Sequence, residues 1–194
     1  HTRVVQIGPG DTRLGFSGFD LLISNPQSPL PPRRNVMHLQ LPLLYPDPTA
    51  IAAASAAWLP RFERLPRPWT AVMIGGSSPP FVLDAAVARR MIVELERFAG
   101  RDGGSLLIST SPRTQGDVVA AVQATVPDNT FLHLWSANAL ENPHPALLGL
   151  ADRFIVTADS ISMQTEVIRL GKPLAIYPLP RDRKTWHRRS RHLL

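Results

Sequence analysis

The sequence predicts an α/β protein whose second half is a Rossmann-like, doubly wound parallel sheet. From Trp69 onward, apolar segments of strand length alternate with segments whose apolar residues recur at helical spacing. Each apolar segment is nearly continuous in Val, Ile and Leu, which is typical of strands buried on both faces of a parallel sheet. Right-handed crossovers between such strands produce the doubly wound arrangement.

The first 65 residues differ in texture, and we interpret them as part of an N-terminal domain followed by a linker. Short apolar pieces are broken by Gly and Pro; they lie at 4–7, 19–24 and 36–44. Of these, 19–24 is typical of a buried strand, and the Pro-rich stretch 26–32 that follows it indicates a loop.

An Ala-rich helix is expected from Pro48 to about Trp58. Pro60, Pro66 and Pro68 come next, and this density of proline predicts a linker. We therefore place the start of a second domain at residue 66 and expect that domain to span 66–194.

Five strands and four helices are expected in the second domain. The expected strands are 70–74, 105–109, 130–135, 153–157 and 173–177. The expected helices are 84–99, 114–126, 143–151 and 162–170. Hydroxyl or amide residues precede several of these helices, and we expect Thr114 or Ser111, Asn142, and Asp159 or Ser160 to cap them.

Composition excludes several classes of protein. The 194 residues are 44% hydrophobic and 19% charged, which is a globular composition, and the absence of cysteine excludes disulfides, thiolate zinc sites and cysteine nucleophiles. No apolar run reaches the length of a membrane helix, and no signal peptide is visible. We expect a cytoplasmic protein, with peripheral contact at the inner membrane left open.

The net charge of +6 is concentrated in the segment 181–194, where six Arg or Lys side chains accompany Asp182. Such a run suits a solvated chain end, an acidic membrane surface or nucleic acid. Nucleic acid is disfavoured because no aromatic-rich platform accompanies the charge.

Known motifs narrow the chemistry further. The sequence has no G-x-G-x-x-G dinucleotide turn, no P-loop and no G-x-S-x-G nucleophile elbow. The six histidines show no H-E-x-x-H spacing, so no metal site is expected.

Polar residues follow three of the expected strands. Gly75, Gly76 and Ser77 follow the expected strand 70–74. Glycines at this place allow the backbone to approach a diphosphate. An ordinary strand-to-helix turn is the alternative interpretation of the same residues. Arg113 follows 105–109 and is a candidate partner of a phosphate. Ligands of doubly wound sheets bind at this carboxyl edge.

The helix after 153–157 carries the densest group of candidate ligands. Ser160, Ser162 and Thr165 lie where a helix N-terminus offers free backbone N–H groups and a positive dipole end to an anion. Glu166 follows within the helix and is a candidate acceptor for the hydroxyls of a ribose. A capping or dipole role for Glu166 is the alternative.

Two segments resemble the donor-binding half of GT-B glycosyltransferases of the lipid-II N-acetylglucosaminyltransferase type. They are the Gly75–Ser77 turn and the stretch from Ser160 to Glu166 that precedes Gly171-Lys172-Pro173. That resemblance implies a diphosphate beside Gly75, Gly76 and Ser77 and a ribose held by Glu166.

The chain is also similar to a bacterial family of unknown function named after a plant mitochondrial fission (elongated mitochondria) protein. The segments that carry this resemblance are 67–76, 104–113, 141–143 and 157–163, together with Glu166. Some members carry the label nucleoside-diphosphate-sugar epimerase. An epimerase of that type needs a Tyr-x-x-x-Lys pair, and neither Tyr45 nor Tyr177 has Lys four residues later.

Two hypotheses follow. In the first, residues 66–194 form a GT-B-like domain that binds a nucleotide-diphospho-sugar as substrate and supports glycosyl transfer without metal or other cofactor; its catalytic residue and acceptor are not assigned. In the second, the protein is a non-enzymatic scaffold that acts through protein or membrane contacts.

Overall fold

The structure is a computed structural model that describes residues 5–7, 16–25 and 29–182, and it divides into two compact units. The first unit comprises residues up to Leu44. It holds a three-stranded parallel sheet in the order β1 (Val5–Ile7), β2 (Leu21–Ser24) and β3 (Val36–His38), with the short helix η2 at Phe16–Gly18. The strand expected over 19–24 is confirmed. The second unit begins at Tyr45.

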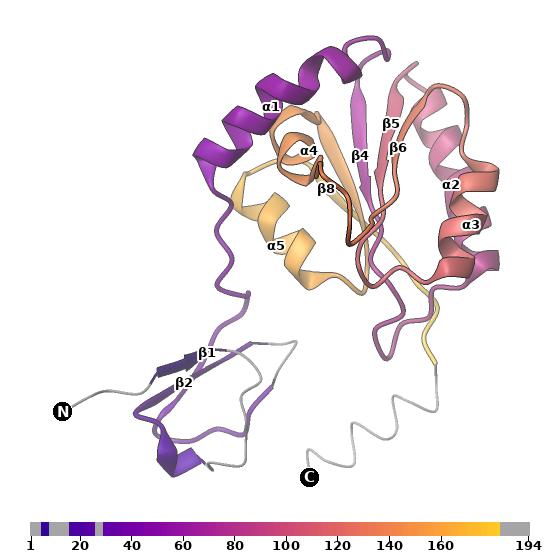
Figure 1. Cartoon of the computed structure of the whole chain (residues 1–194). Coiled ribbons are helices and arrows are strands. Elements are labelled where there is room, and N and C mark those ends of the chain that lie inside the picture. The colour runs from indigo at the N-terminus through magenta and orange to yellow at the C-terminus, as the bar shows by residue number, and fades with distance from the viewer. Residues whose placement is uncertain (1–4, 8–15, 26–28, 183–194) are drawn as a thin grey trace. The chain divides into compact units, whose positions relative to one another are not determined.

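The second unit is built on a five-stranded parallel sheet in the order β6-β5-β4-β7-β8 (Figure 1). Its strands are β4 (Trp69–Met73), β5 (Ser105–Ser109), β6 (Thr130–His133), β7 (Arg153–Thr157) and β8 (Leu174–Tyr177). Every neighbouring pair is parallel. The predicted Rossmann-like layer is confirmed, and each predicted strand lies within two residues of an observed one.

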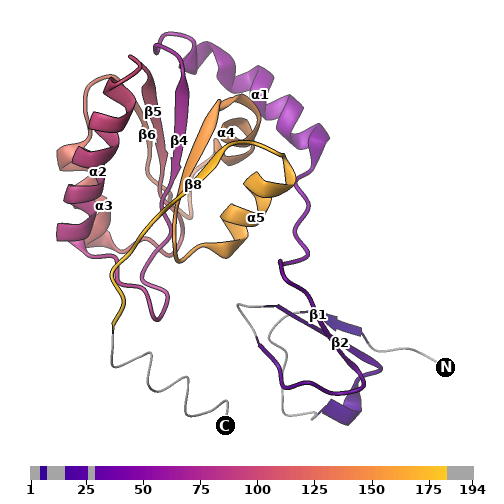
Figure 2. The ribbon, with the colours of Figure 1, turned by 180° about the vertical axis from the view of Figure 1, so that it is seen from behind.

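Helices cover both faces of this sheet, as the two opposite views show (Figures 1 and 2). The helices are α1 (Pro48–Phe62), α2 (Ala85–Gly100), α3 (Gly116–Thr125), α4 (His144–Leu150) and α5 (Ile161–Arg169). One core lies between the sheet and α2 and α3, and the other lies beneath α1, α4 and α5. The strands between the two cores are apolar on both faces, which explains their continuous Val, Ile and Leu.

The predicted end of the first helix at Trp58 is wrong, because α1 continues through Pro60 to Phe62. Proline removes the N–H that would bond the carbonyl of Ala56, and both residues lie on the exposed side of the helix, where water can satisfy that carbonyl. Phe62 is fully buried. Burial of an aromatic ring contributes about 1.5–3 kcal/mol, enough to offset much of the cost of a proline near a helix end.

The connections set the position of a binding site. From β4 the chain winds outward through α2 and α3 to β6, and it then crosses to β7 on the other side of β4. β4 and β7 are therefore neighbours from which the chain leaves in opposite directions. In doubly wound sheets the crevice beyond the carboxyl ends of two such strands is where ligands bind.

Candidate functional site

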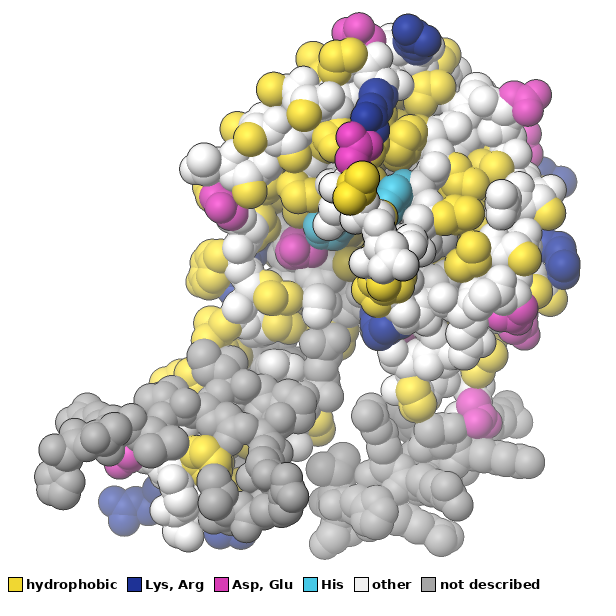
Figure 3. All heavy atoms as spheres, viewed as in Figure 1, with side chains coloured by type: hydrophobic (Ala, Val, Ile, Leu, Met, Phe, Trp, Pro, Cys, Tyr) yellow, Lys and Arg dark blue, Asp and Glu magenta, His cyan; other side chains and the backbone are white. Residues whose placement is uncertain are grey.

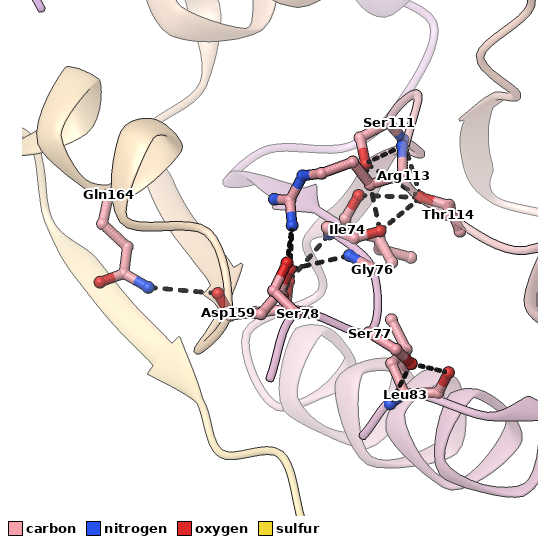
Figure 4. Close-up of polar contacts among 12 residues, drawn as sticks. Ile74, Gly76, Ser77, Ser78, Leu83, Ser111, Arg113, Thr114, Asp159 and Gln164 are labelled. Atoms are coloured by element: carbon pink, nitrogen blue, oxygen red, sulfur yellow. Dashed lines mark hydrogen bonds and ion pairs between the residues drawn. The ribbon is translucent and has the colours of Figure 1, made fainter. Parts of the chain in front are cut away.

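The polar residues at the carboxyl edge converge on the side chain of Asp159, which lies two residues beyond the end of β7 (Figure 4). Its Oδ2 accepts from the backbone N–H of Gly76 at 2.8 Å and from Nη1 of Arg113 at 2.9 Å. Its Oδ1 accepts from the hydroxyl of Thr157 at 2.7 Å. The side chain has no exposed surface, so this carboxylate is bonded and sealed from water.

Gly75 leaves room for this carboxylate, and Gly76 leaves room for the backbone of Arg113. A Cβ at Gly75 would lie 2.6 Å from Oδ1 of Asp159 and closer still to Oδ2. A Cβ at Gly76 would lie 2.7 Å from the backbone carbonyl carbon of Arg113. Close approach thus requires glycine at both positions, and in this structure the approaching groups belong to the protein.

The loop after β5 is tied to the end of β4. The hydroxyls of Ser111 and Thr114 both donate to the carbonyl of Gly75, at 3.1 and 2.5 Å. The prediction that one of them caps the next helix is wrong, since the N-cap of α3 is Gln115 and makes no side-chain bond. The hydroxyls hold the β4 turn instead.

Ser77 and Ser78 point in different directions. The hydroxyl of Ser77 donates to the carbonyl of Leu83 and accepts from its N–H, both at 2.9 Å, so it closes the turn before α2. The hydroxyl of Ser78 accepts from Arg113 (Figure 4). Ser78 therefore lies with the Asp159 group and Ser77 does not.

The N-terminus of α5 adjoins this group, because Ser160 is both the neighbour of Asp159 and the N-cap of the helix. Ser160 is buried and makes no side-chain capping bond. Ser162 lies in the first turn and is partly exposed, whereas the buried Thr165 donates to the carbonyl of Ile161. The N-cap residue of α4 is Pro143 and not the expected Asn142, although the side chain of Asn142 accepts from the N–H of His144.

Glu166 lies further along α5 and faces α4. One of its carboxylate oxygens, Oε2, is 3.0 Å from Nε2 of His144, the first residue of α4. Both side chains are about one quarter exposed, at 24% for Glu166 and 25% for His144. No hydrogen bond within the described ranges links Glu166 to the Asp159 group, so the predicted residues form two sets.

A separate hollow of about 580 Å³ lies beside the edge strand β6. Its walls are largely apolar; they comprise Trp58, Arg61, Phe131, His133, Leu134, Ala139, Leu140 and Glu141. Arg61 and Glu141 form a bidentate ion pair across it at 2.6 and 2.9 Å, and this pair holds the pKa of the Glu141 carboxyl below its ordinary value. Figure 3 shows histidine, acidic and apolar side chains adjoining one another on this side of the second unit.

Sequence reasoning missed Asp159 and His144 as members of these groups. Asp159 was expected only to cap a helix, although its place at the end of a strand beside a Gly-Gly turn was a usable signal. His144 carried no signal, because its pairing with Glu166 depends on how α4 packs beside α5. No set of three or more His, Asp or Glu side chains in residues 5–7, 16–25 and 29–182 could hold a metal ion.

The fold defines the class of protein: an α/β protein with a Rossmann-like parallel sheet and a cluster of polar side chains at the switch point of that sheet. The profile of the family described as Mitochondrial fission ELM1 matches residues 1–194, and the chain belongs to that family.

Two curated relatives are similar to the chain. The chain is similar to the Mitochondrial fission protein ELM1 of Arabidopsis thaliana, with 29% identity over 80% of the chain and 36% of the relative. It is also similar to the Uncharacterized protein RP120 of Rickettsia prowazekii (strain Madrid E), with 31% identity over 71% of the chain and 40% of the relative. The matched part is therefore well under half of either relative. Of the described helices, none is long and apolar enough to cross a membrane.

Proposed function

We propose that the second unit binds the diphosphate and ribose of a nucleotide-sugar at the crevice between the ends of β4 and β7. The observation that carries this proposal is that Arg113 and the N-terminus of α5 lie together, beside the Gly75-Gly76 turn, at the switch point of the sheet. Backbone N–H groups and a guanidinium are the donors that phosphate oxygens prefer.

The phosphate side of the site is formed by α5 and Arg113. The first turn of α5 has backbone N–H groups without helical partners, and its dipole favours an anion there. Ser160, which makes no capping bond, supplies a hydroxyl at the same end. Arg113 is 44% exposed and supplies the cation.

Glu166 is proposed to hold the ribose. Its carboxylate is held by His144 on one side and is partly exposed, so it retains acceptor positions for two vicinal hydroxyls. His144 then acts as a positioning residue that keeps the carboxylate from turning away.

The reaction that this arrangement supports is glycosyl transfer without a metal. The bond between the sugar and the diphosphate breaks, and the negative charge that develops on the leaving diphosphate is stabilised by the α5 N-terminus and Arg113. The sugar passes to an acceptor hydroxyl whose proton goes to a base that lies outside the groups described here.

Calorimetric titration with UDP, GDP and ADP tests the proposal. We expect at least one of them to bind, and Glu166→Ala to weaken that binding about tenfold, since a hydrogen bond to a charged group contributes about 1.5–3 kcal/mol. Glu96→Ala is the matched control, because Glu96 lies exposed on α2. Binding of none of the three, or equal binding by the Glu166 and Glu96 variants, contradicts the proposal.

A second candidate is a scaffold that contacts protein or membrane through the hollow beside β6. It is favoured by the apolar walls of the hollow and by Leu140, whose side chain is fully exposed at its rim. One relative is named a mitochondrial fission protein. Sedimentation with anionic liposomes distinguishes the two: the scaffold predicts co-sedimentation that Leu140→Ser reduces, and the nucleotide site predicts no dependence on Leu140.

A further inference from the structure

The donors proposed to receive a phosphate oxygen are already occupied by a carboxylate of the chain. The N–H of Gly76 and Nη1 of Arg113 meet at one oxygen, Oδ2 of Asp159, at 2.8 and 2.9 Å. A backbone N–H and a guanidinium converging on one oxygen is an arrangement suited to an anion. In this structure the anion is Asp159.

The turn is shaped around that carboxylate. Gly75 leaves the space that Asp159 fills, and Gly76 lets the backbone of Arg113 approach. The N–H of Gly75 is also taken, since it donates to the hydroxyl of Thr157 at 2.9 Å. A diphosphate therefore cannot use the Gly75 and Gly76 amides while Asp159 stays in place.

The two partners of the ion pair differ in their freedom to move. Asp159 is held by Thr157 and Gly76 and has no exposed surface, so its carboxylate is fixed in place. Arg113 is 44% exposed, and its other side-chain contact is the hydroxyl of Ser78. Arg113 is therefore the partner that can leave.

Electrostatics opposes a ligand as long as the pair is closed. The carboxylate cancels the charge of Arg113, so a diphosphate arriving at the crevice meets a neutral pair rather than a cation. Moving the guanidinium onto the diphosphate leaves Asp159 with the Gly76 and Thr157 bonds only.

We propose that Asp159 is an internal competitor for the anion and sets the affinity of the site: it holds Arg113 in the unliganded protein, and a diphosphate binds by taking Arg113 from it. This inference rests on the proposed nucleotide-sugar site. It makes Asp159 a determinant of affinity and Arg113 the group that changes partner.

The test is calorimetric titration of the full chain with UDP and with inorganic pyrophosphate. Asp159→Asn keeps the size of the side chain and removes its charge, so we expect UDP to bind about tenfold more tightly than to the unaltered protein. Arg113→Gln is expected to weaken binding about tenfold. The double variant is expected to match Arg113→Gln, because the effect of Asp159 is exerted through Arg113. Pyrophosphate is expected to follow the same order.

Several outcomes are decisive. If the unaltered protein binds UDP and a folded Asp159→Asn variant binds it equally or less tightly, Asp159 is not a competitor and the inference is wrong, while the nucleotide site stands. If neither protein binds any nucleotide, the nucleotide site itself fails, and the inference fails with it.

A second measurement serves if Asp159→Asn does not fold. A crystal structure of the unaltered protein with pyrophosphate is expected to show Arg113 on the ligand and beyond about 4 Å, the limit of an ion pair, from Asp159. A ligand bound with the Arg113–Asp159 distance still at 2.9 Å overturns the inference.

Discussion

Gly75 is a residue at which close packing leaves no room for a side chain. A methyl group there would meet the carboxylate of Asp159, so Gly75→Ala is expected to lower the free energy of unfolding by about 1–3 kcal/mol. Gly100→Ala is the control, because a Cβ added there would meet no atom within 4 Å apart from the adjoining backbone of its own helix. Urea denaturation of both variants checks this, and equal stability would show that Asp159 moves aside without cost.

His133 provides a prediction about pH. Burial lowers the pKa of His133, although a bond to the backbone of Glu141 opposes the shift. Below the ordinary pKa of 6.5 the unfolded chain therefore binds more protons than the folded one, and the stability that this residue contributes is lost as pH falls from 6.5 through the folded pKa.

Below pH 6.5, we expect the urea midpoint of the unaltered protein to decrease with falling pH more steeply than that of His133→Gln. Denaturation curves between about pH 5 and 8, where histidine titrates, provide the measurement. Parallel pH profiles for the two proteins would assign the effect to other groups.

The residues of the candidate site were predictable only in part. Gly75, Gly76 and Arg113 were recognisable because each follows a predicted strand, and parallel strands end at one edge. The partner of Arg113 was not, since Asp159 is 46 positions away and only the packing of β7 beside β4 brings it there. Whether Glu166 binds a ribose stays a prediction.

At the scale of elements, Lys172 joins two helices. It follows Gly171, whose φ of 65° turns the chain out of α5, and its ammonium donates to the carbonyls of Gly149 and Ala151 at 2.6 and 2.9 Å. These carbonyls lie at the C-terminal end of α4, where a cation is favourable. Burial lowers the pKa of Lys172.

We expect Lys172→Met to destabilise the protein by about 1–2 kcal/mol, since two carbonyls lose a donor and the methionine still fills the space. Arg89→Met, at an exposed position on α2, is the control and should change stability by less than about 0.5 kcal/mol. Thermal unfolding of the two variants provides the test. Equal shifts of their midpoint temperatures would mean that the hydrogen bonds of Lys172 contribute nothing to stability.

Helices and strands were predictable from the sequence except where a local signal was outweighed. The continuous apolar strands and the helical spacing over 84–99 place their elements correctly, because each pattern reports burial. Pro60 led to the wrong prediction for the end of α1. A proline on the solvent side of the last turns of a helix costs little free energy compared with what the burial of Phe62 contributes. The predicted cap of α3 was wrong because the hydroxyls of Ser111 and Thr114 bond to the carbonyl of Gly75 instead of to the helix.

At the scale of the whole molecule, α1 decides where an independently stable fragment begins. α1 packs against α4 and lies in the second unit, which starts at Tyr45. The sequence placed the second domain at residue 66, which would leave Trp58 and Phe62 outside it.

A fragment starting at Tyr45 is expected to unfold cooperatively, whereas one starting at Pro66 should lose most of its stability. Two buried aromatic side chains contribute about 1.5–3 kcal/mol each, a large part of the 5–15 kcal/mol typical of a domain. Urea denaturation followed by circular dichroism compares them. Equal midpoints would show that α1 is dispensable and that 66 is the better boundary.

The aromatic side chains beneath α1 have a practical consequence. Trp58, Phe62, Trp69 and Phe131 form a chain of ring contacts with centroids 4.8–6.0 Å apart. Indoles held in such rigid, asymmetric surroundings differ in emission and near-ultraviolet optical activity from the same groups in water. The tryptophan side chains between α1 and the sheet thus provide an intrinsic optical signal. The separation of α1 from the sheet can be followed over time in the unmodified protein without attaching a dye.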